Sequence, residues 1–387
     1  MKVSQIYEIM NTVTRETLGE EAVVNEDLSN IVQLGKQFID VIGVDNYVRK
    51  LNDVIGKMIF VNRVYKGRVP SVLMDGWEYG SILTKYAAEL PDAEENESWE
   101  LQDRTVYETQ MFYKPNVTVS LWNDRVTFEI PISFTEMQVK SAFNSAENLN
   151  SFISMIYTAI ENSMTIKLDA LIMRTINNFI GVTIANAYSA ADYTGVGNTR
   201  AVNLLALYNA GPNAGGTALT KDNCIHNPDF IKFASETMMN VQDRLGTISE
   251  LFNVGSKPRF TPKDKLHVVM LSEFKHSADV YLQSGVYNDE YTKLPNAELV
   301  PYWQGSGLNY DFDSTSSINI KTSDNHSVAT SGILCVMFDR GALGVANQNP
   351  RVTTAYNAKG EFWNEWHKYD AGYFNDINEN FVVFFVA

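Results

Sequence analysis

The chain has 387 residues, of which 45% are hydrophobic and 20% charged, and its formal net charge at pH 7 is -15. This length predicts two or three domains with a sizeable core, and the composition excludes a disordered protein. The acidic balance argues against a protein that grips nucleic acid, because phosphate contacts require clustered Lys and Arg. The longest purely apolar run, residues 381–387, is far shorter than a membrane span, so we expect no membrane anchor.

Export from the cell is not expected either. The chain starts MKVSQIYEIM, where Gln5 and Glu8 interrupt the apolar run that a signal peptide needs. Its two cysteines, Cys224 and Cys335, are too few for a disulfide framework. We therefore expect buried, reduced thiols in a protein made in a cytoplasm.

The N-terminal part of the chain predicts an arm of short helices. Apolar spacing favours helices over residues 3–18, 27–42 and 46–55, followed by a strand over 58–64.

Residues 77–123, hereafter the ribbon, predict two extended arms around an acidic tip at 91–100. Apolar and polar residues alternate along both arms, although residues 82–90 contain enough good helix formers for a helix to be the alternative. Pro115 predicts an edge or a kink in the return arm. Because a two-stranded ribbon is only marginally stable alone in water, something else must cover it.

A strand over residues 126–133 leads into a helical region. Ser133 and Glu136 have the S-x-x-E spacing of a capping box, which predicts a short helix starting near Thr135. After a polar break at 145–150, apolar residues recur with a helical period from position 149 to 179. This pattern predicts one long helix of about 45 Å.

The following segment, residues 181–216, predicts loops, with turns at GVGNTR and GPNAGG. Asn227 and Pro228 then predict the start of a helix that runs to position 245 and is closed by Gly246. Further elements are a buried strand over 266–271, a helix from Ser272 to position 283, and strands near Leu299, near Ile318 and over 332–338. Together these predict a mixed α+β domain.

No residue pattern indicates catalysis or metal binding. The five histidines are scattered and lack metal-ligand spacing, so surface or core positions are favoured: His226, His267, His276, His326 and His367. The glycine-rich turns lack the Lys-Ser/Thr of a phosphate loop. Asp311 and Asp313 resemble part of a calcium loop, but the central glycine and the terminal glutamate are missing, so a solvated loop is favoured. We expect no enzyme activity, no cofactor and no metal.

Two other patterns could indicate either a function, as a catalytic nucleophile or a sugar-binding surface, or a structural role. Cys224 near His226 shows no third member of a nucleophile triad. The aromatic run over residues 362–374 could stack on sugars, but packing in a sheet or against another subunit is favoured, since aromatic residues dominate core and interface energetics.

The order of these parts resembles a known family. A hairpin excursion with a polar tip, a strand, a capped short helix, a long helix and a mixed domain resemble the tailed-phage major capsid protein of the Hong Kong 97 type. The stretch FEIPISFTEMQVKSAFNSAENLNSFISMIYTAIENSMTIKLDALI, residues 128–172, is similar to the region of small podovirus capsid proteins that enters the long spine helix. The stretch from MFDRGALGVANQNPR to NENFVVFF, residues 337–385, is similar to their closing segment.

The resemblance implies an α+β fold of the Hong Kong 97 type. It divides the chain into an N-terminal arm (1–57), an extended loop with the first peripheral-domain strands (58–132), a peripheral domain with the spine helix (133–200), an axial domain (201–345), and return strands of the peripheral domain with a final axial strand (346–387).

The resemblance also implies a function. Copies of the chain would assemble into pentamers and hexamers that form the icosahedral head of a tailed phage and enclose its double-stranded DNA without sequence-specific contact. A separate scaffolding protein and a portal are the other implied partners. The expected location is the virion capsid, assembled in the host cytoplasm without a membrane.

The extended loop would then lie across a neighbouring copy. The expected contact residues are the tip acids and the apolar residues of the return arm: Asp92, Glu94, Glu95, Glu97, Glu100, Tyr107, Met111, Tyr113 and Val117. The possible basic partners of the tip acids are Lys140, Lys167, Arg174 and Arg351, among which the sequence does not choose. The net charge is compatible with an acidic lining that repels packaged DNA weakly, and equally with a role in solubility alone.

Three alternatives stay open at this point. Some members of the family join subunits through a Lys-Asn isopeptide bond, for which the candidate lysines are Lys85 and Lys114 and the candidate asparagines Asn347, Asn349 and Asn357; these residue types are too common to indicate it. A cellular shell of the same fold, an encapsulin, is the second alternative. A glycan-binding or enzymatic domain is the third.

Overall fold

The structure is a computed structural model, and it describes residue 11 and residues 68–74, 83–91, 93, 95–107, 109–135, 137–138, 146–188, 193, 195–283, 297–304, 311–321 and 327–387. The helices predicted over 3–18, 27–42 and 46–55 and the strand over 58–64 lie, apart from residue 11, outside the described residues. Two compact units make up the chain. Unit 1 draws on Met1–Glu78, Arg125–Ile176 and Gly344–Tyr373, and unit 2 on Tyr79–Asp124, Asn177–Leu343 and Phe374–Ala387.

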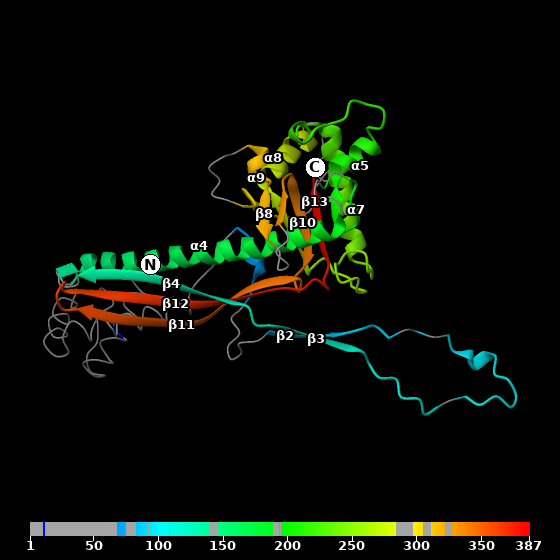
Figure 1. Ribbon diagram of the computed structural model, residues 1–387, viewed down its shortest axis with the longest axis horizontal. Helices are drawn as coiled ribbons and strands as arrows, with labels where there is room; N and C mark the ends of the chain where they lie inside the picture. Colours follow the sequence, from blue (N-terminus) through cyan, green and yellow to red (C-terminus); the bar gives the residue numbers. More distant parts are fainter. Residues whose placement is uncertain are drawn as a thin grey trace. The chain divides into compact units, whose positions relative to one another are not determined.

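Unit 1 is built on a four-stranded sheet of order β1-β11-β12-β4 (Figure 1). Its strands are β1 (Leu73–Met74), β11 (Leu343–Asn357), β12 (Phe362–Asn375) and β4 (Arg125–Thr135). β12 and β4 are antiparallel, from Phe362 opposite Thr135 to Gly372 opposite Arg125. Because successive side chains of a strand point to opposite faces, alternate residues of β12 are buried, among them Trp363, whose ring lies 6.0 Å from that of Phe134. Pro131 is tolerated in β4 because this strand is at the end of the sheet order.

The predicted long helix is confirmed as α4, Ala146–Ala187, with 42 residues and a length of about 63 Å. Asn347 of β11 contacts it, with its Nδ2 atom 3.8 Å from Sδ of Met164. The helix does not end near position 180, as the apolar period suggested. Thr183 and Ile184 are fully buried, so the buried face of the helix continues for two more turns.

The predicted capping box is wrong by two residues. Ser133 lies within β4 and donates its hydroxyl to Oδ1 of Asn364 at 2.5 Å. The reciprocal pair is Thr135 and Gln138: Oγ1 of Thr135 accepts from the Gln138 amide at 3.3 Å, and Oε1 of Gln138 accepts from the Thr135 amide at 2.8 Å. The cap is displaced because pairing with β12 keeps the chain extended as far as Thr135.

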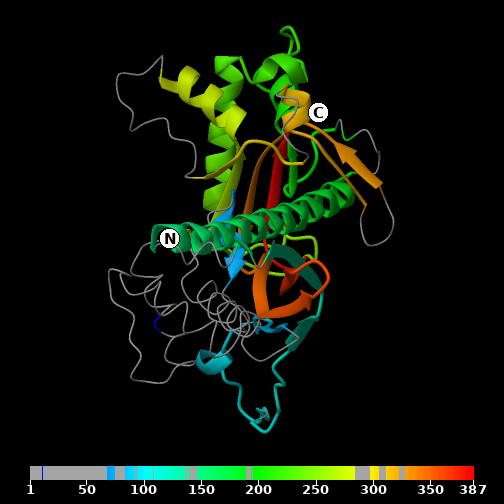
Figure 2. The same ribbon diagram turned by 90° about the vertical axis from the view of Figure 1, so that its left-hand side faces the viewer.

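Unit 2 contains a five-stranded sheet of order β5-β13-β10-β6-β7. β10 (Ile333–Asp339) is antiparallel to both β13 (Phe381–Phe385) and β6 (Leu266–Leu271), and β5 (Ala201–Asn203) and β7 (Glu298–Val300) add parallel strands. β13, red in Figure 2, is buried at every position, which explains why its sequence is a continuous apolar run rather than an alternating one. The core continues into α4, where the Phe179 ring stacks 4.1 Å from that of Phe381.

The helices of unit 2 are α5 (Leu204–Ala210), α6 (Lys221–Cys224), α7 (Pro228–Leu245), α8 (Ser272–Gln283) and α9 (Phe312–Thr315). The predicted start of α7 is confirmed, since Oδ1 of Asn227 accepts from the amides of Asp229 and Phe230 at 3.0 Å. The predicted strands near Leu299, near Ile318 and over 332–338 are confirmed as β7, β8 (Ile318–Lys321) and β10. β8 pairs with β9 (Ser327–Thr330) in a separate hairpin.

The prediction of loops over 181–216 is wrong in part. This stretch contains the last turns of α4, the buried strand β5 and α5, whose N-cap is Asn203. β5 forms because it pairs in parallel with β13, Val383 lying opposite Ala201. A three-residue strand whose partner lies at the far end of the chain has no local signature.

The ribbon is a hairpin only near its base. β2 (Leu83–Ala88) pairs antiparallel with β3 (Val117–Trp122), so the alternative of a helix over 82–90 is wrong for Leu83–Ala88. The acidic tip contains a 3-10 helix, Glu97–Trp99. Tyr107, Met111 and Tyr113 were expected in a strand, but none of these three residues lies in one. Pro115 lies two residues before β3 and has no N–H with which to continue the ladder beyond Asn116.

Within the described parts of the chain, no helix combines the length and the apolar character that crossing a bilayer requires.

Candidate functional site

The outer part of the ribbon exposes apolar side chains. Every described residue from position 90 to 119 whose burial is known is exposed. Trp99, Val106 and Phe112 expose 96%, 91% and 83% of their surface. The apolar residues predicted as contacts are exposed as well: Tyr107, Met111, Tyr113 and Val117. Scattered exposed apolar residues need no explanation, whereas a contiguous set of large ones marks an interaction surface.

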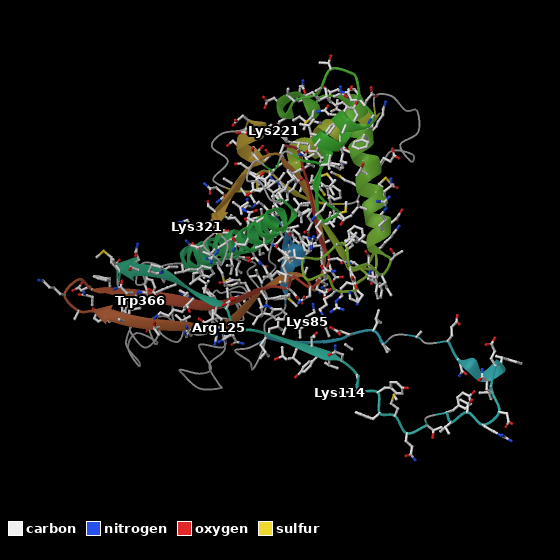
Figure 3. All side chains as sticks on the ribbon, turned by 45° about the vertical axis from the view of Figure 1, so that its right-hand side comes forward. Lys85, Lys114, Arg125, Lys221, Lys321 and Trp366 are labelled. Carbon is white, nitrogen blue, oxygen red and sulfur yellow. The ribbon has the colours of Figure 1, made fainter. Side chains whose placement is uncertain are left out.

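The base of the ribbon, in contrast, is fixed to the rest of unit 2. Nζ of Lys85, on β2, lies 2.8 Å from Oδ2 of Asp376 and 2.6 Å from Oε1 of Glu379. It also donates to the carbonyl of Gly341 at 3.2 Å. Figure 3 shows Lys85 at the base of the ribbon and Lys114 farther along it. The ammonium therefore has three acceptors from two turns that lie far from β2 in sequence.

Two further contacts hold the base. Oε1 of Glu89 accepts from Nζ of Lys257 at 2.7 Å, and this hydrogen bond is the main cause that lowers the pKa of the Glu89 carboxyl. On β3, the ring of Trp122 lies 5.2 Å from that of Phe374. Both strands of the hairpin thus contact other segments of unit 2.

The predicted charged residues have different surroundings. Glu95 and Glu100 are exposed at the tip, and Glu97 is the first residue of its 3-10 helix. Asp92, Glu94 and Lys140 lie outside the described residues. The role of the tip acids and of Lys140 in contacts between copies stays a prediction.

The other predicted cations belong to unit 1. Lys167 is exposed on α4. The Arg174 guanidinium lies 5.8 Å from the centre of the Tyr373 ring. Arg351 forms a bidentate pair with Asp370, at 2.7 and 3.0 Å, and these hydrogen bonds raise the pKa of the guanidinium. Arg351 thus already has an acidic partner within its own chain, which makes it the least suitable of the three for a tip acid.

Three buried titratable groups are neutral near pH 7. His367 and Glu365 lie side by side on β12, with Nε2 3.5 Å from Oε2. Burial lowers the pKa of His367 to about 4 and raises that of Glu365 to about 9, so both are neutral near pH 7. Burial likewise raises the pKa of the Cys224 thiol to about 12. Both cysteines are free and buried, as expected.

Metal sites are also not supported by the described part of the chain, where no three or more His, Cys, Asp and Glu side chains gather. Asp311 and Asp313 do not form a calcium loop. Asp311 is the N-cap residue of α9, and Asp313 pairs with Lys221. His226 and His276 are exposed, His267 is partly buried and His326 lies outside the described residues.

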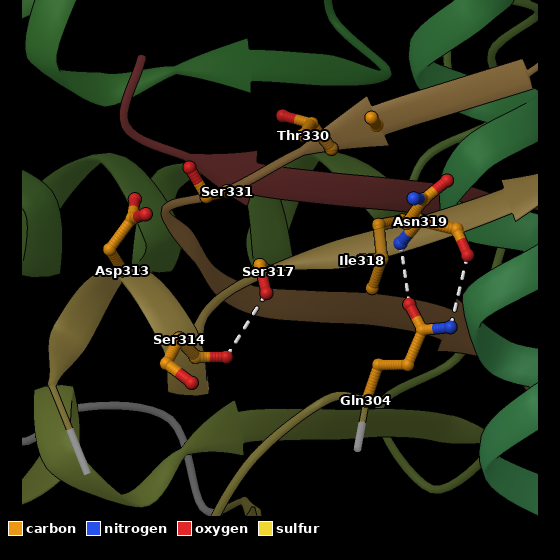
Figure 4. A pocket seen from close by; sticks show the side chains of 9 residues that line it. Gln304, Asp313, Ser314, Ser317, Ile318, Asn319, Thr330 and Ser331 are labelled. Atoms are coloured by element: carbon orange, nitrogen blue, oxygen red, sulfur yellow. Dashed lines mark hydrogen bonds between the residues drawn. The ribbon is translucent and has the colours of Figure 1, made fainter. Parts of the chain in front are cut away.

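Unit 2 has a cavity of about 500 Å³ between α9 and the β8–β9 hairpin (Figure 4). Its lining is mostly small and polar: Gln304, Asp313, Ser314, Ser317, Ile318, Asn319, Ala329, Thr330 and Ser331. Gln304 uses its side-chain amide to pair with the backbone N–H and C=O of Asn319, at 2.5 and 3.0 Å. The amide thus takes the place of a neighbouring strand along β8, a structural role.

Half of the aromatic residues of β12 are unavailable for stacking on a sugar. Trp363, Tyr369 and Phe374 are buried, whereas Phe362, Trp366 and Tyr373 are partly exposed. The three buried rings are packed within the fold, as the favoured interpretation predicted.

Comparison with known proteins identifies the family. A family model described as Phi29-like phage major capsid protein matches residues 10–385. The chain belongs to this family. This match confirms the resemblance stated from the sequence and does not favour the encapsulin, glycan-binding or enzymatic alternatives.

One solved capsid structure supports the fold. The chain resembles one in the capsid structure of Staphylococcus phage Andhra with a TM-score of 0.51 and 8% identity, over 85% of this chain and 86% of that one. A chain of the native bacteriophage P68 structure matches with a TM-score of 0.49 and 7% identity, over 84% of this chain and 86% of that one. A chain of the cyanophage P-SCSP1u capsid matches with a TM-score of 0.43 and 9% identity, over 82% of this chain and 86% of that one. No curated protein sequence matches the chain.

The mixed helix and sheet architecture therefore belongs to a structural subunit of a phage capsid. The residues at the ribbon base were not predicted in this role. One signal was present in the sequence: in β2, Lys85 shares the inward face with Leu83 and Ala87, and these three positions are less exposed than their neighbours. A lysine on an inward face requires an acidic partner nearby.

Proposed function

We propose that copies of this chain join into pentamers and hexamers through their ribbons and so form the icosahedral head of a tailed phage. In this proposal the fold follows the Hong Kong 97 plan, with α4 as the spine helix and the five domains at the boundaries predicted above. Head-to-tail contacts that close by rotation produce such rings. The virion capsid is the site of function, and assembly occurs in the host cytoplasm.

One observation carries the proposal: the ribbon has a fixed base and an exposed apolar outer part. Trp99, Val106 and Phe112 are almost fully exposed in the single chain. Burying one such side chain contributes about 1.5–3 kcal/mol. A shell repeats this contribution in every copy, which makes a neighbouring copy a suitable cover for the ribbon.

The acidic tip has a smaller role in this proposal. An exposed ion pair contributes about 0–1 kcal/mol, so Glu95 and Glu100 select the register of the ribbon on the neighbour rather than hold the shell together. Of the three predicted cations that the structure describes, Lys167 and Arg174 are the best placed, since both are exposed on α4.

The inner surface of the shell does not need to bind the enclosed genome. With a formal net charge of -15, the shell repels double-stranded DNA weakly and allows it to move during packaging. A separate scaffolding protein and a portal are the remaining partners of this proposal, and catalysis has no part in it.

A substitution of the outer ribbon tests the proposal. The variant Trp99→Ser, Val106→Ser and Phe112→Ser removes the apolar surface without touching the base. The control is Ile248→Ser with Val280→Ser, which changes side chains of unit 2 that are 58% and 64% exposed. Sedimentation velocity and negative-stain microscopy measure the product.

We expect the ribbon variant to remain as folded, unassembled subunits with an unchanged melting temperature, while the control forms shells. Normal shells from the ribbon variant would contradict the proposal.

A further inference from the structure

The base of the ribbon is a preformed charged socket. The carboxyl groups of Asp376 and Glu379 converge on Lys85, and their side chains are only 5% and 12% exposed. Two carboxylates this close repel each other in a partly dry environment unless a cation lies between them. Arg259, whose Nε is 3.6 Å from Oε1 of Glu379, is the second cation that faces the socket.

Backbone contacts hold the socket in place. The amide of Asp376 donates to the carbonyl of Ala342 at 2.7 Å. Oδ1 of Asp376 accepts from the backbone amide and the side-chain amide of Asn378, both at 3.1 Å, which leaves Oδ2 for Lys85. Groups that are already oriented lose little entropy when they bind a cation.

The turn at Gly341 provides the space that the lysine needs. A Cβ atom at this position would lie 3.3 Å from Nζ of Lys85 and 3.2 Å from Oδ1 of Asp339. A side chain here would crowd the ammonium, so the turn fits the lysine closely.

A small change at the base has a large effect at the tip. Each arm has about 14 residues beyond the β2–β3 ladder, a reach of up to about 45 Å at about 3.3 Å per residue. A rotation of about 10° at the base would therefore move the tip by about 8 Å, which is farther than one strand spacing. The direction of the base thus determines which part of a neighbour the ribbon reaches.

We propose that Lys85 is the positioning residue of the ribbon: its ion pairs with Asp376 and Glu379 set the direction in which the ribbon leaves unit 2 and hence where it meets the next copy. This inference rests on the proposed function above. It assigns Lys85 to an interaction within its own subunit rather than to a covalent bond with an asparagine of another.

The test compares three variants. Lys85→Met removes the charge and keeps the length of the side chain, Lys85→Arg keeps the charge, and Lys114→Met is the control, because Lys114 is exposed on the outer ribbon. Hydrogen–deuterium exchange of unassembled subunits measures the opening of the β2–β3 ladder. Electron microscopy measures the fraction of closed shells and the spread of their diameters.

For Lys85→Met we expect exchange in β2 and β3 to rise about tenfold, the fraction of closed shells to fall severalfold and the diameters to spread. The melting temperature should fall only slightly, because Arg259 stays beside Glu379 and Asn378 still donates to Asp376 when the lysine is gone. Lys85→Arg and Lys114→Met should behave as the parent does.

Two outcomes would overturn the inference. If Lys85→Met forms shells of normal size in normal yield, Lys85 does not position the ribbon. If Lys85→Met and Lys85→Arg both lower the melting temperature and the yield equally, the residue is merely structural. Failure of the proposed function is separate, because it would appear as normal assembly of the Trp99, Val106 and Phe112 variant.

Discussion

Replacing Gly332 with alanine should destabilise unit 2 far more than the same change at Gly215. Both glycines have a left-handed backbone, with φ of +86° and +84°. They differ in their surroundings. A Cβ atom at Gly332 would lie 1.9 Å from the backbone oxygen of Val386, whereas one at Gly215 would meet nothing within 4 Å. Gly332 also accepts from the Val386 amide at 2.9 Å, next to the β10–β13 ladder.

The expected loss in the free energy of unfolding follows from two effects, the left-handed backbone and the clash of the added Cβ atom. A left-handed backbone costs a non-glycine residue about 1–2 kcal/mol, and alanine recovers about 0.4–1 kcal/mol by restricting the unfolded chain. Gly215→Ala should therefore cost about 0–1.5 kcal/mol. At Gly332 the clash adds about 1–3 kcal/mol, because a backbone oxygen cannot rotate away as a side chain can. The total is about 1–4.5 kcal/mol.

Urea unfolding of unassembled subunits measures this difference. The midpoint should fall for Gly332→Ala with the slope unchanged, and the yield of shells should fall with it. Gly215→Ala should stay close to the parent in both. Equal midpoints for the two variants would refute the reasoning, because strain alone would then account for both.

Three further predictions concern buried and capping residues. Burial keeps Glu365 protonated in the folded protein up to about pH 9, while the unfolded chain loses this proton above its ordinary pKa. The contribution of Glu365 to the folding stability should therefore fall as the pH rises between these values, by up to about 4 kcal/mol from pH 5 to 8. Glu365→Gln should remove this loss, so its melting temperature should exceed that of the parent increasingly toward pH 8; parallel curves would contradict this. Phe179→Ala removes the stack on Phe381 and should cost about 3–5 kcal/mol in urea unfolding, against less than about 0.5 kcal/mol for Ile166→Ala on an exposed position of the same helix. Asn227→Ala deletes the cap of α7 and should cost about 1 kcal/mol, whereas Asn227→Gly should cost only a few tenths; equal losses would exclude the cap as the cause.

Local patterns were sufficient for many elements of the fold. The 3.6-residue period predicted α4, and the pair Asn227 and Pro228 predicted the start of α7. A continuous apolar run predicted β6, and the resemblance to the capsid family implied the final strand, β13. In each case the interactions that form the element lie within a few residues along the chain, or the apolar content alone requires burial. The order of these elements also led to the capsid family, which the family match confirms.

The predicted ends of helices and strands were wrong where pairing with a distant strand competes with a local sequence signal. Ser133 and Glu136 have the spacing of a capping box, yet Ser133 stays in β4 because β12 pairs with it there. β5 has only three residues and forms through β13. A local motif contributes about 1 kcal/mol, which a registered ladder of several backbone hydrogen bonds exceeds.

The ribbon likewise has some features that its own sequence determines and others that only the folded structure creates. Its exposed apolar residues, its acidic tip and the break at Pro115 are properties of its own sequence, because nothing else in the chain is needed to read them. The ion pairs of Lys85 are different: they join residues 291 and 294 positions apart. Only folding brings β2 beside the turn that carries Asp376 and Glu379, since it is the five-stranded sheet that fixes where this turn lies.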